Sequence, residues 1–185
     1  MNAKVQIQFP EQSIPFYSVA DIISAYSLAS EAATQLRTLA NQINKATAFV
    51  KAFVQENDKA DSSAFAELEN LIIISQQLAN SQADTYMREL NRHTHKPDDQ
   101  YDAGDLYDAY SLAYENTSWL ETMFYEAKDE VEIIKEAIKQ NTHGAVFATL
   151  ERLIHIAAYL AETHSNTFDI ESEKYESEWE ATKNG

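Results

Sequence analysis

Apolar residues recur along this chain at alternating steps of three and four, which is the spacing of one face of a long helix. Two such series occur in the first half, starting at Ile22 and Phe65, and two in the second half, starting at Leu106 and Phe147. Only three Gly and three Pro interrupt the chain, so few positions can break a helix. The pattern predicts an all-α protein with helices over residues 19–57, 62–92, 103–141 and 144–178.

The two halves of the chain resemble each other. The string AYSLA occurs at 25–29 and again at 109–113. With an offset of 84 residues, 21–58 and 105–142 share 11 identities in 38 positions, and with an offset of 82, 65–91 and 147–173 share 11 in 27. Chance would give about two or three identities in the longer comparison, so the sequence predicts a tandem duplication of one αα-hairpin.

Local signals divide the chain into four parts. Ser18 with Asp21, and Asp102 with Asp105, have the spacing of helix-capping boxes. Two hairpins can bury their apolar faces against each other as one four-helix bundle with internal pseudo-symmetry. The expected organisation is an extended N-terminal arm (1–17), a first hairpin (18–92), a polar linker (93–104) and a second, acidic hairpin (105–185). The arm is expected to pack Phe9, Phe16 and Tyr17 across a bundle end, and the alternative is a strand that pairs with the sheet edge of a partner.

Composition narrows the functional classes. The chain has 185 residues, of which 44% are apolar, and no cysteine, which excludes disulfides and thiol catalysis. The N-terminus lacks the apolar stretch of a signal peptide, and the longest aliphatic run, Leu71–Ile74, is too short to cross a bilayer. We therefore expect a soluble, cytoplasmic protein that does not contact a membrane.

The net charge of −16 is distributed unequally. Residues 1–92 contain ten acidic and seven basic residues, whereas residues 93–185 contain twenty acidic and again seven basic ones. Because both hairpins share the same apolar pattern, folding does not require the added acids, whose mutual repulsion opposes it. At 100° per residue, the acidic side chains of the third helix form a stripe on the side away from the core. The members of this stripe are Asp105, Asp108, Glu115, Glu126, Asp129 and Glu130.

Histidine and carboxylate motifs give weak support for a catalytic or metal site. The chain lacks the paired Glu-x-x-His motifs of di-iron bundles. His93 and His95 have a chelating spacing but lie in the expected linker, and the calcium-loop pattern at Asp98–Asp102 has Ala103 where Gly is required. His155 and His164 fall on or beside the apolar face of the fourth helix. We therefore expect neither a metal nor a cofactor.

The segment Arg88–His93 resembles HEPN ribonucleases in its Arg-x4-His spacing. This resemblance covers six residues and would make Arg88 a phosphate ligand and His93 a general acid or base. Its second position is Glu89, where that family usually has a small polar residue.

The acidic stripe instead favours a non-enzymatic protein that binds a basic partner, because a row of carboxylates on a helix can occupy a nucleic-acid-binding surface of another protein. An antitoxin-like inhibitor or a mobile-element antagonist of a defence nuclease is the leading hypothesis. Direct binding to nucleic acid is disfavoured by the charge. The alternatives are a self-associating structural or adaptor bundle and the ribonuclease.

Overall fold

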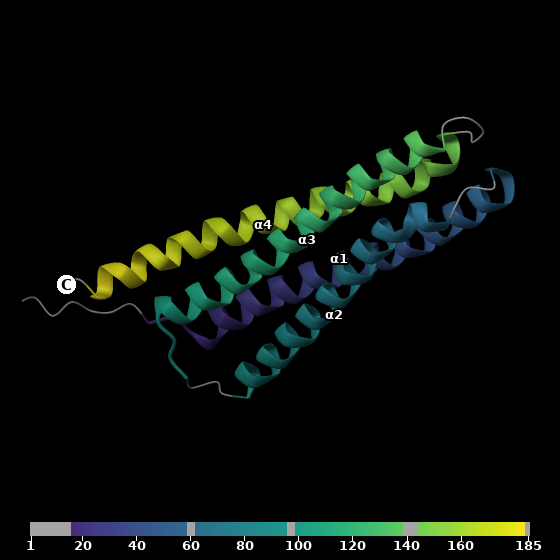
Figure 1. Ribbon diagram of the computed structural model, residues 1–185. Coiled ribbons are helices and arrows are strands. Elements are labelled where there is room, and N and C mark those ends of the chain that lie inside the picture. Colours follow the sequence, from purple (N-terminus) through teal and green to yellow (C-terminus); the bar gives the residue numbers. More distant parts are fainter. Residues whose placement is uncertain (1–15, 59–61, 96–98, 139–143, 184–185) are drawn as a thin grey trace, which may run out of the picture.

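Four long helices make up most of the protein, as Figure 1 shows for the computed structural model. The structure describes residues 16–58, 62–95, 99–138 and 144–183. The predicted all-α four-helix bundle is confirmed. A short 3-10 helix precedes each of the helices α2 and α4. The elements are α1 (Val19–Asp58), η1 (Ser62–Phe65), α2 (Ala66–Thr94), α3 (Ala103–Ala137), η2 (Gly144–Phe147) and α4 (Ala148–Lys183).

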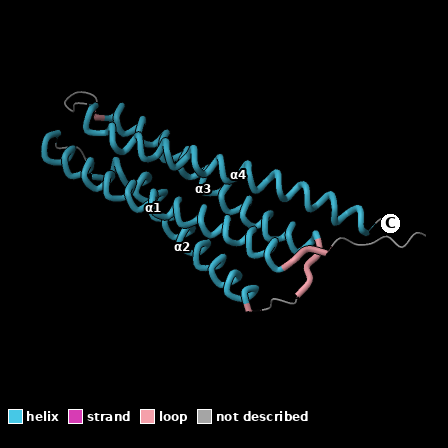
Figure 2. Tube along the Cα trace, turned by 180° about the vertical axis from the view of Figure 1, so that it is seen from behind, coloured by secondary structure: helices cyan, strands magenta, loops and turns pink. Residues whose placement is uncertain are grey.

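The helices form two antiparallel hairpins that lie against each other. Helix α1 pairs with α2, and α3 pairs with α4, while α1 also contacts α4 and α2 contacts α3. The C-terminal ends of α1 and α3 lie at the same end of the bundle, and the C-terminal end of α2 and the start of α3 lie at the opposite end (Figures 1 and 2). This arrangement leaves one side of every helix facing solvent.

Two boundaries differ from the sequence prediction. Helix α2 continues to Thr94, two residues beyond its predicted end, so His93 belongs to a helix and not to the expected linker, whereas α3 starts at Ala103 as predicted. Helix α4 extends five residues beyond the predicted end, to Lys183. Its last turns are anchored by Trp179, which stacks on Tyr107 of α3 with ring centroids 6.0 Å apart. The predicted end of the third helix, residue 141, lies outside the described residues.

The predicted capping box is complete at α3, but at α1 only its Asp21 half forms, because the Ser18 hydroxyl donates to the Asp21 carboxylate and the Asp21 backbone N–H bonds to the Ser18 carbonyl. At α3 the Asp102 carboxylate accepts the Asp105 backbone N–H at 3.1 Å, and the Asp105 carboxylate accepts the Asp102 N–H at 2.9 Å. At α1 the Asp21 carboxylate accepts both the backbone N–H and the hydroxyl of Ser18, at 2.8 and 2.7 Å. These bonds satisfy donors that have no partner within the helix, and so define where each helix starts.

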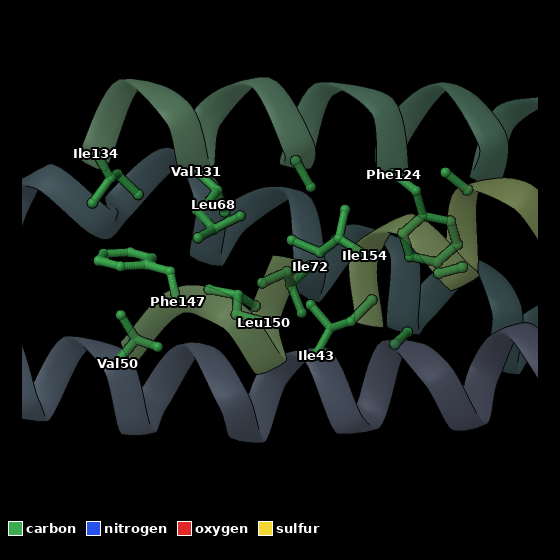
Figure 3. Packing of buried hydrophobic residues seen from close by; sticks show 14 of the residues in the cluster. Ile43, Val50, Leu68, Ile72, Phe124, Val131, Ile134, Phe147, Leu150 and Ile154 are labelled. Carbon is green, nitrogen blue, oxygen red and sulfur yellow. The ribbon is translucent and has the colours of Figure 1, made fainter. Parts of the chain in front are cut away.

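The core has two chemically different halves. Near the hairpin turns it is mainly aliphatic, and Figure 3 shows side chains from all four helices meeting there, including Ile43, Ile72, Val131 and Leu150. Toward the other end the buried residues are rich in tyrosine. This second cluster contains Tyr26, Tyr86, Tyr101, Tyr110, Phe168 and Tyr175. Burial raises the pKa of Tyr86 and of Tyr110 to about 12, further above neutral pH than the ordinary value of 10.0.

The described part of the N-terminal arm closes the tyrosine-rich end. Tyr17 and Tyr101 exchange two backbone hydrogen bonds, of 2.8 and 3.2 Å, which join the arm to the segment before α3. The Tyr17 hydroxyl donates to Glu178 of α4, and its ring packs edge-on against Tyr175. Phe16 was expected to pack on the bundle but is 64% exposed. Phe9, the other aromatic residue expected to pack there, belongs to residues 1–15, which lie outside the described residues.

Several features recur in both hairpins at the offsets found in the sequence. Lys51 pairs with Glu69 between α1 and α2, and Lys135 pairs with Glu151 between α3 and α4. Each second helix follows a four-residue 3-10 helix that ends in a buried phenylalanine, Phe65 or Phe147. A duplication of one ancestral hairpin stays a prediction from the sequence. Such a duplication would produce recurring contacts of this kind.

Candidate functional site

The predicted acidic stripe lies on the solvent side of α3. Five of its six members are exposed, and Glu130 is half-buried. The opposite side of the helix carries the buried Leu106, Tyr110 and Leu120. The stripe extends over about 38 Å from Asp105 to Glu130 at a rise of 1.5 Å per residue. Its carboxylates are therefore accessible along most of the bundle.

Asp105 has a structural role at one end of this stripe. Its carboxylate is bound to the backbone of Asp102 in the capping box, and it lies where the helix dipole favours negative charge. Asp108 is exposed one turn further along. Asp108 is therefore the first acid of the stripe that does not cap the helix.

Large apolar side chains alternate with the acids on the same side of α3. Leu112 is 37% exposed, Trp119 48% and Ile133 60%. Together with the exposed acids they follow the three-and-four spacing of a single helix face. We call this set the outer face of α3; it consists of Asp108, Leu112, Glu115, Trp119, Glu126, Asp129 and Ile133. The sequence interpretation missed its apolar members, although their spacing was visible in the printed sequence.

The negative charge of the outer face is not neutralised within the protein. In the ranges that the structure describes, no ion pair involves Asp108, Glu115, Glu126 or Asp129. The equivalent positions of α1, at the 84-residue offset, are Ser24, Glu31, Gln42 and Lys45. The uncompensated row of acids is thus a property of the second hairpin alone.

The field of these acids reaches the tyrosine-rich core. Burial is the main cause of the raised pKa of Tyr26, and the charges of Glu89, Asp108 and Asp105 add to it while Arg92 opposes it. Glu115 acts in the same direction on Tyr86. One end of the outer face therefore lies close enough to α1 and α2 to influence their side chains.

The structure does not bring Arg88 and His93 together as a ribonuclease site would require. Arg88 is exposed and donates to the Asp84 carbonyl at 3.3 Å and to the Thr85 hydroxyl at 3.1 Å. His93 is only 5% exposed, and its Nδ1 lies 2.7 Å from the Tyr101 hydroxyl. Its ring therefore holds the α2–α3 connection against the bundle and is shielded from a substrate.

The other histidines also have separate environments. His95 Nδ1 lies 2.6 Å from the Asn91 carbonyl, so His93 and His95 face different partners. His164 is half-buried beside Gln35, and burial lowers its pKa. His155 is exposed, so it is not a core residue, but it lies beside the buried Ile154, at the edge of the apolar face. Within the part of the chain that the structure describes, no three His, Asp or Glu side chains are grouped to hold a metal ion.

One segment, Gly144–Lys183, is long and apolar enough to cross a membrane by length and composition alone. Its most apolar window of 18 residues has a mean hydropathy of 1.3, and 33% of that window is buried in the bundle. A single helix of this kind is weak evidence for a membrane span, because packed helices pass the same test. The longest aliphatic run, used in the sequence analysis, did not detect it.

Comparisons with protein-family models, with curated proteins and with solved structures gave no match to this chain. A functional interpretation consequently depends on the residues and geometry described above.

Proposed function

We propose that this protein is a non-enzymatic inhibitor that acts in the cytoplasm by binding a basic surface of another protein through the outer face of α3. The partner is a nucleic-acid-binding protein, such as a toxin or a defence nuclease that a mobile element must block. The observation that carries the proposal is the row of exposed, unpaired carboxylates on α3, which the equivalent face of α1 lacks. Electrostatic complementarity of this kind speeds association and selects basic partners.

The spacing of the acids bears on whether they imitate a nucleic acid. Six carboxylates over about 38 Å give roughly one charge per 6 to 7 Å of helix at a rise of 1.5 Å per residue. One strand of DNA carries one phosphate per 3.4 Å of axis, so the stripe has about half that charge density. The apolar side chains between the acids add contacts that a phosphate backbone lacks. We therefore favour a mixed electrostatic and apolar interface over a close copy of DNA.

The test is a comparison of partner capture by two forms of the full-length protein. The first is the unmodified chain, and the second carries Asp108→Asn, Glu115→Gln, Glu126→Gln and Asp129→Asn. Proteins captured from the native host are identified by mass spectrometry, and the captured partner is then purified for binding kinetics. We expect the amides to weaken binding and to remove most of the salt dependence of the association rate, because exposed charges steer encounter over about 8 Å at physiological salt.

A matched control uses acids of the first hairpin. Glu31→Gln and Glu67→Gln remove exposed carboxylates outside the outer face of α3. These changes should leave affinity and its salt dependence almost unaltered. Equal losses from both sets of amides, or no loss from the first set, would refute the proposal.

A self-associating adaptor bundle is a second candidate, favoured by the exposed apolar residues at equivalent positions of α1 and α3. Phe49 is 64% exposed, and its equivalent Ile133 is 60% exposed. Sedimentation equilibrium separates the candidates. A stable homo-oligomer that dissociates with Phe49→Ser and Ile133→Ser would favour the adaptor, whereas a monomer would favour the inhibitor.

A further inference from the structure

A pocket of about 310 Å³ lies between α3 and α4, near the hairpin turn and on a different side of α3 from its outer face. Val131 and Ile154 are buried and form its apolar floor. Lys128, Arg152 and His155 line the same pocket and are exposed. The volume is at the lower end of the range for small-molecule sites.

The cations at this pocket are unusual for so acidic a hairpin. Residues 93–185 contain only seven Lys and Arg against twenty acids, yet Lys128 and Arg152 both line this one pocket. Neither side chain has an ion-pair partner among the residues that the structure describes. His155 adds a ring nitrogen that can donate a hydrogen bond.

Two acids also line the pocket, but both are engaged by a third cation. The Lys135 ammonium donates to Glu132 at 2.9 Å and also to Glu151. The Lys135–Glu151 pair has a counterpart in the first hairpin, where Lys51 pairs with Glu69. This ion pair is therefore a shared structural feature of the hairpins, and it leaves Lys128 and Arg152 available to a ligand.

The first hairpin has no cationic side chains at the positions equivalent to those that line the pocket. Applying the two offsets, Lys128, Arg152 and His155 correspond to Asn44, Asn70 and Ile73. Of the two floor residues, Ile154 corresponds to the apolar Ile72, whereas Val131 corresponds to the polar Thr47. The cationic side chains are thus confined to the second hairpin.

The equivalent groove of the first hairpin is also bridged. Gln76 of α2 donates to the Asn41 side chain at 2.9 Å and accepts from Asn44 at 3.5 Å. In the second hairpin the position of Gln76 is occupied by Ala158, which is buried and too short to reach across. The open pocket of the second hairpin thus coincides with the replacement of this bridging glutamine by alanine. The bridging partner Asn44 is replaced at the equivalent position by Lys128.

We propose that the pocket between α3 and α4 binds a small amphiphilic organic anion, whose carboxylate or phosphate group contacts Lys128, Arg152 and His155 and whose hydrocarbon part covers Val131 and Ile154. Arginine and lysine supply the charge-assisted hydrogen bonds that such head groups require. Burial of the hydrocarbon part on the apolar floor supplies the rest of the binding free energy. This site is independent of the proposed partner surface.

The experiment titrates the full-length protein, labelled with carbon-13 in its methyl groups, with four probes of equal chain length. Octanoate and octyl phosphate carry the two head groups, and 1-octanol and octylamine are the neutral and cationic controls. We expect saturable shifts of the Val131 and Ile154 methyl signals with one or both anions at about 1 mM or below. The controls should bind at least about tenfold more weakly, since they lack charge-assisted hydrogen bonds. The stronger anion identifies the head group.

Variants that introduce residues of the first hairpin test the site directly. Lys128→Asn with Arg152→Asn changes only exposed positions and should weaken anion binding roughly tenfold or more. Ala158→Gln should obstruct the pocket in the manner of Gln76, and circular dichroism checks that it folds. If Ala158→Gln fails to fold, the exposed pair still decides the question. Absence of saturable shifts with both anions, equal shifts with 1-octanol, or unchanged binding by the Asn variant would each overturn the proposal.

Discussion

Tyr26 stacks on His93, with ring centroids 5.5 Å apart and planes inclined by 13°. Tyr110 stacks on Tyr175 in nearly the same way, at 5.6 Å and 6°. Tyr26 precedes Tyr110 by 84 residues, and His93 precedes Tyr175 by 82, which are the offsets of the two sequence alignments. The histidine that sequence spacing marked as a candidate catalytic group thus occupies the place of a core tyrosine in the other hairpin.

Replacing His93 by alanine should destabilise the bundle. The change removes the stack on Tyr26 and leaves the buried Tyr101 hydroxyl without the His93 Nδ1. We expect the free energy of unfolding to fall by about 1 to 3 kcal/mol, measured by urea denaturation. Arg88→Ala is the control, since Arg88 is exposed and its loss should change stability by about 0.5 kcal/mol or less.

The same variant tests the ribonuclease alternative. The unmodified protein should not cleave RNA, because His93 is enclosed between Tyr26 and Tyr101. Incubation of a labelled RNA without divalent metal is the measurement. Turnover by the unmodified protein that disappears with His93→Ala in a folded variant would show that the non-enzymatic interpretation is wrong.

Two glycines provide opposite outcomes for the same substitution. A Cβ added at Gly104 would lie 2.9 Å from both the Asp102 carboxylate and the Trp179 indole nitrogen, whereas one at Gly144 would meet nothing within 4 Å. Overpacking in Gly104→Ala should therefore lower the free energy of unfolding by about 1 to 3 kcal/mol. The better helix propensity of alanine should offset about 0.5 to 1 kcal/mol of this loss. Gly144→Ala should gain about 0.4 to 1 kcal/mol. Thermal unfolding of both variants checks this, and a stabilised Gly104→Ala would contradict the close packing of Trp179.

The helices could be predicted from the sequence because three-and-four spacing decides which side of each helix is buried. Leu36, Leu68, Leu120 and Leu150 all lie on predicted apolar faces and are fully buried. The predicted end of α2 was two residues short because the polar composition of HTHKPDDQ hides a final turn that includes the buried His93. His93 is polar, and its burial depends on Tyr26 and Tyr101, which are distant in sequence and carry no local signal.

The candidate sites were predictable to a lesser degree. Helical geometry placed the acidic stripe correctly on the solvent side, but an emphasis on charge left out Trp119. The pocket at Lys128 accompanies the replacement of the bridging Gln76 by Ala158, which a comparison of the two packed hairpins makes visible. Cavities arise from what neighbouring helices leave unfilled, so a periodic pattern in one helix cannot reveal them.

Glu121 should make stability depend on pH. Burial and the neighbouring Glu162 raise the pKa of its carboxyl, while a hydrogen bond with Ser165 opposes them. A carboxyl whose pKa is higher in the folded chain favours folding below its unfolded pKa, near 4.5, and this contribution is lost as the pH rises through the folded pKa. Glu121→Gln should therefore stabilise the protein more at pH 7 than near pH 4, and the gain should be small because the carboxyl is only partly buried and is screened by solvent.

Urea unfolding at both pH values measures this difference. Glu126→Gln is the matched control, because Glu126 is exposed on the outer face of the same helix. Its substitution should have a smaller effect at pH 7. Equal gains from Glu121→Gln at pH 4 and pH 7 would exclude titration of this carboxyl as the cause.

Trp119 should contribute to partner binding without contributing to stability. It is 48% exposed on the outer face of α3, and the equivalent residue of α1 is Gln35. Trp119→Gln therefore installs a side chain that the same fold already accepts in the first hairpin. We expect the free energy of unfolding to change by about 0.5 kcal/mol or less. Affinity for the captured basic partner should fall tenfold or more, because exposed tryptophans at the centre of interfaces are frequent binding hot spots.

The two kinds of substitution should differ in their kinetic signature. Loss of Trp119 should raise the dissociation rate and leave the salt dependence of association intact, since the apolar contact forms after encounter. The four amides on the outer face should lower the association rate and flatten its salt dependence. Stopped-flow and surface-binding kinetics at several salt concentrations measure both. If Trp119→Gln left affinity unchanged while the amides abolished binding, the partner would recognise the carboxylates alone. Close imitation of a nucleic acid would then be the better explanation.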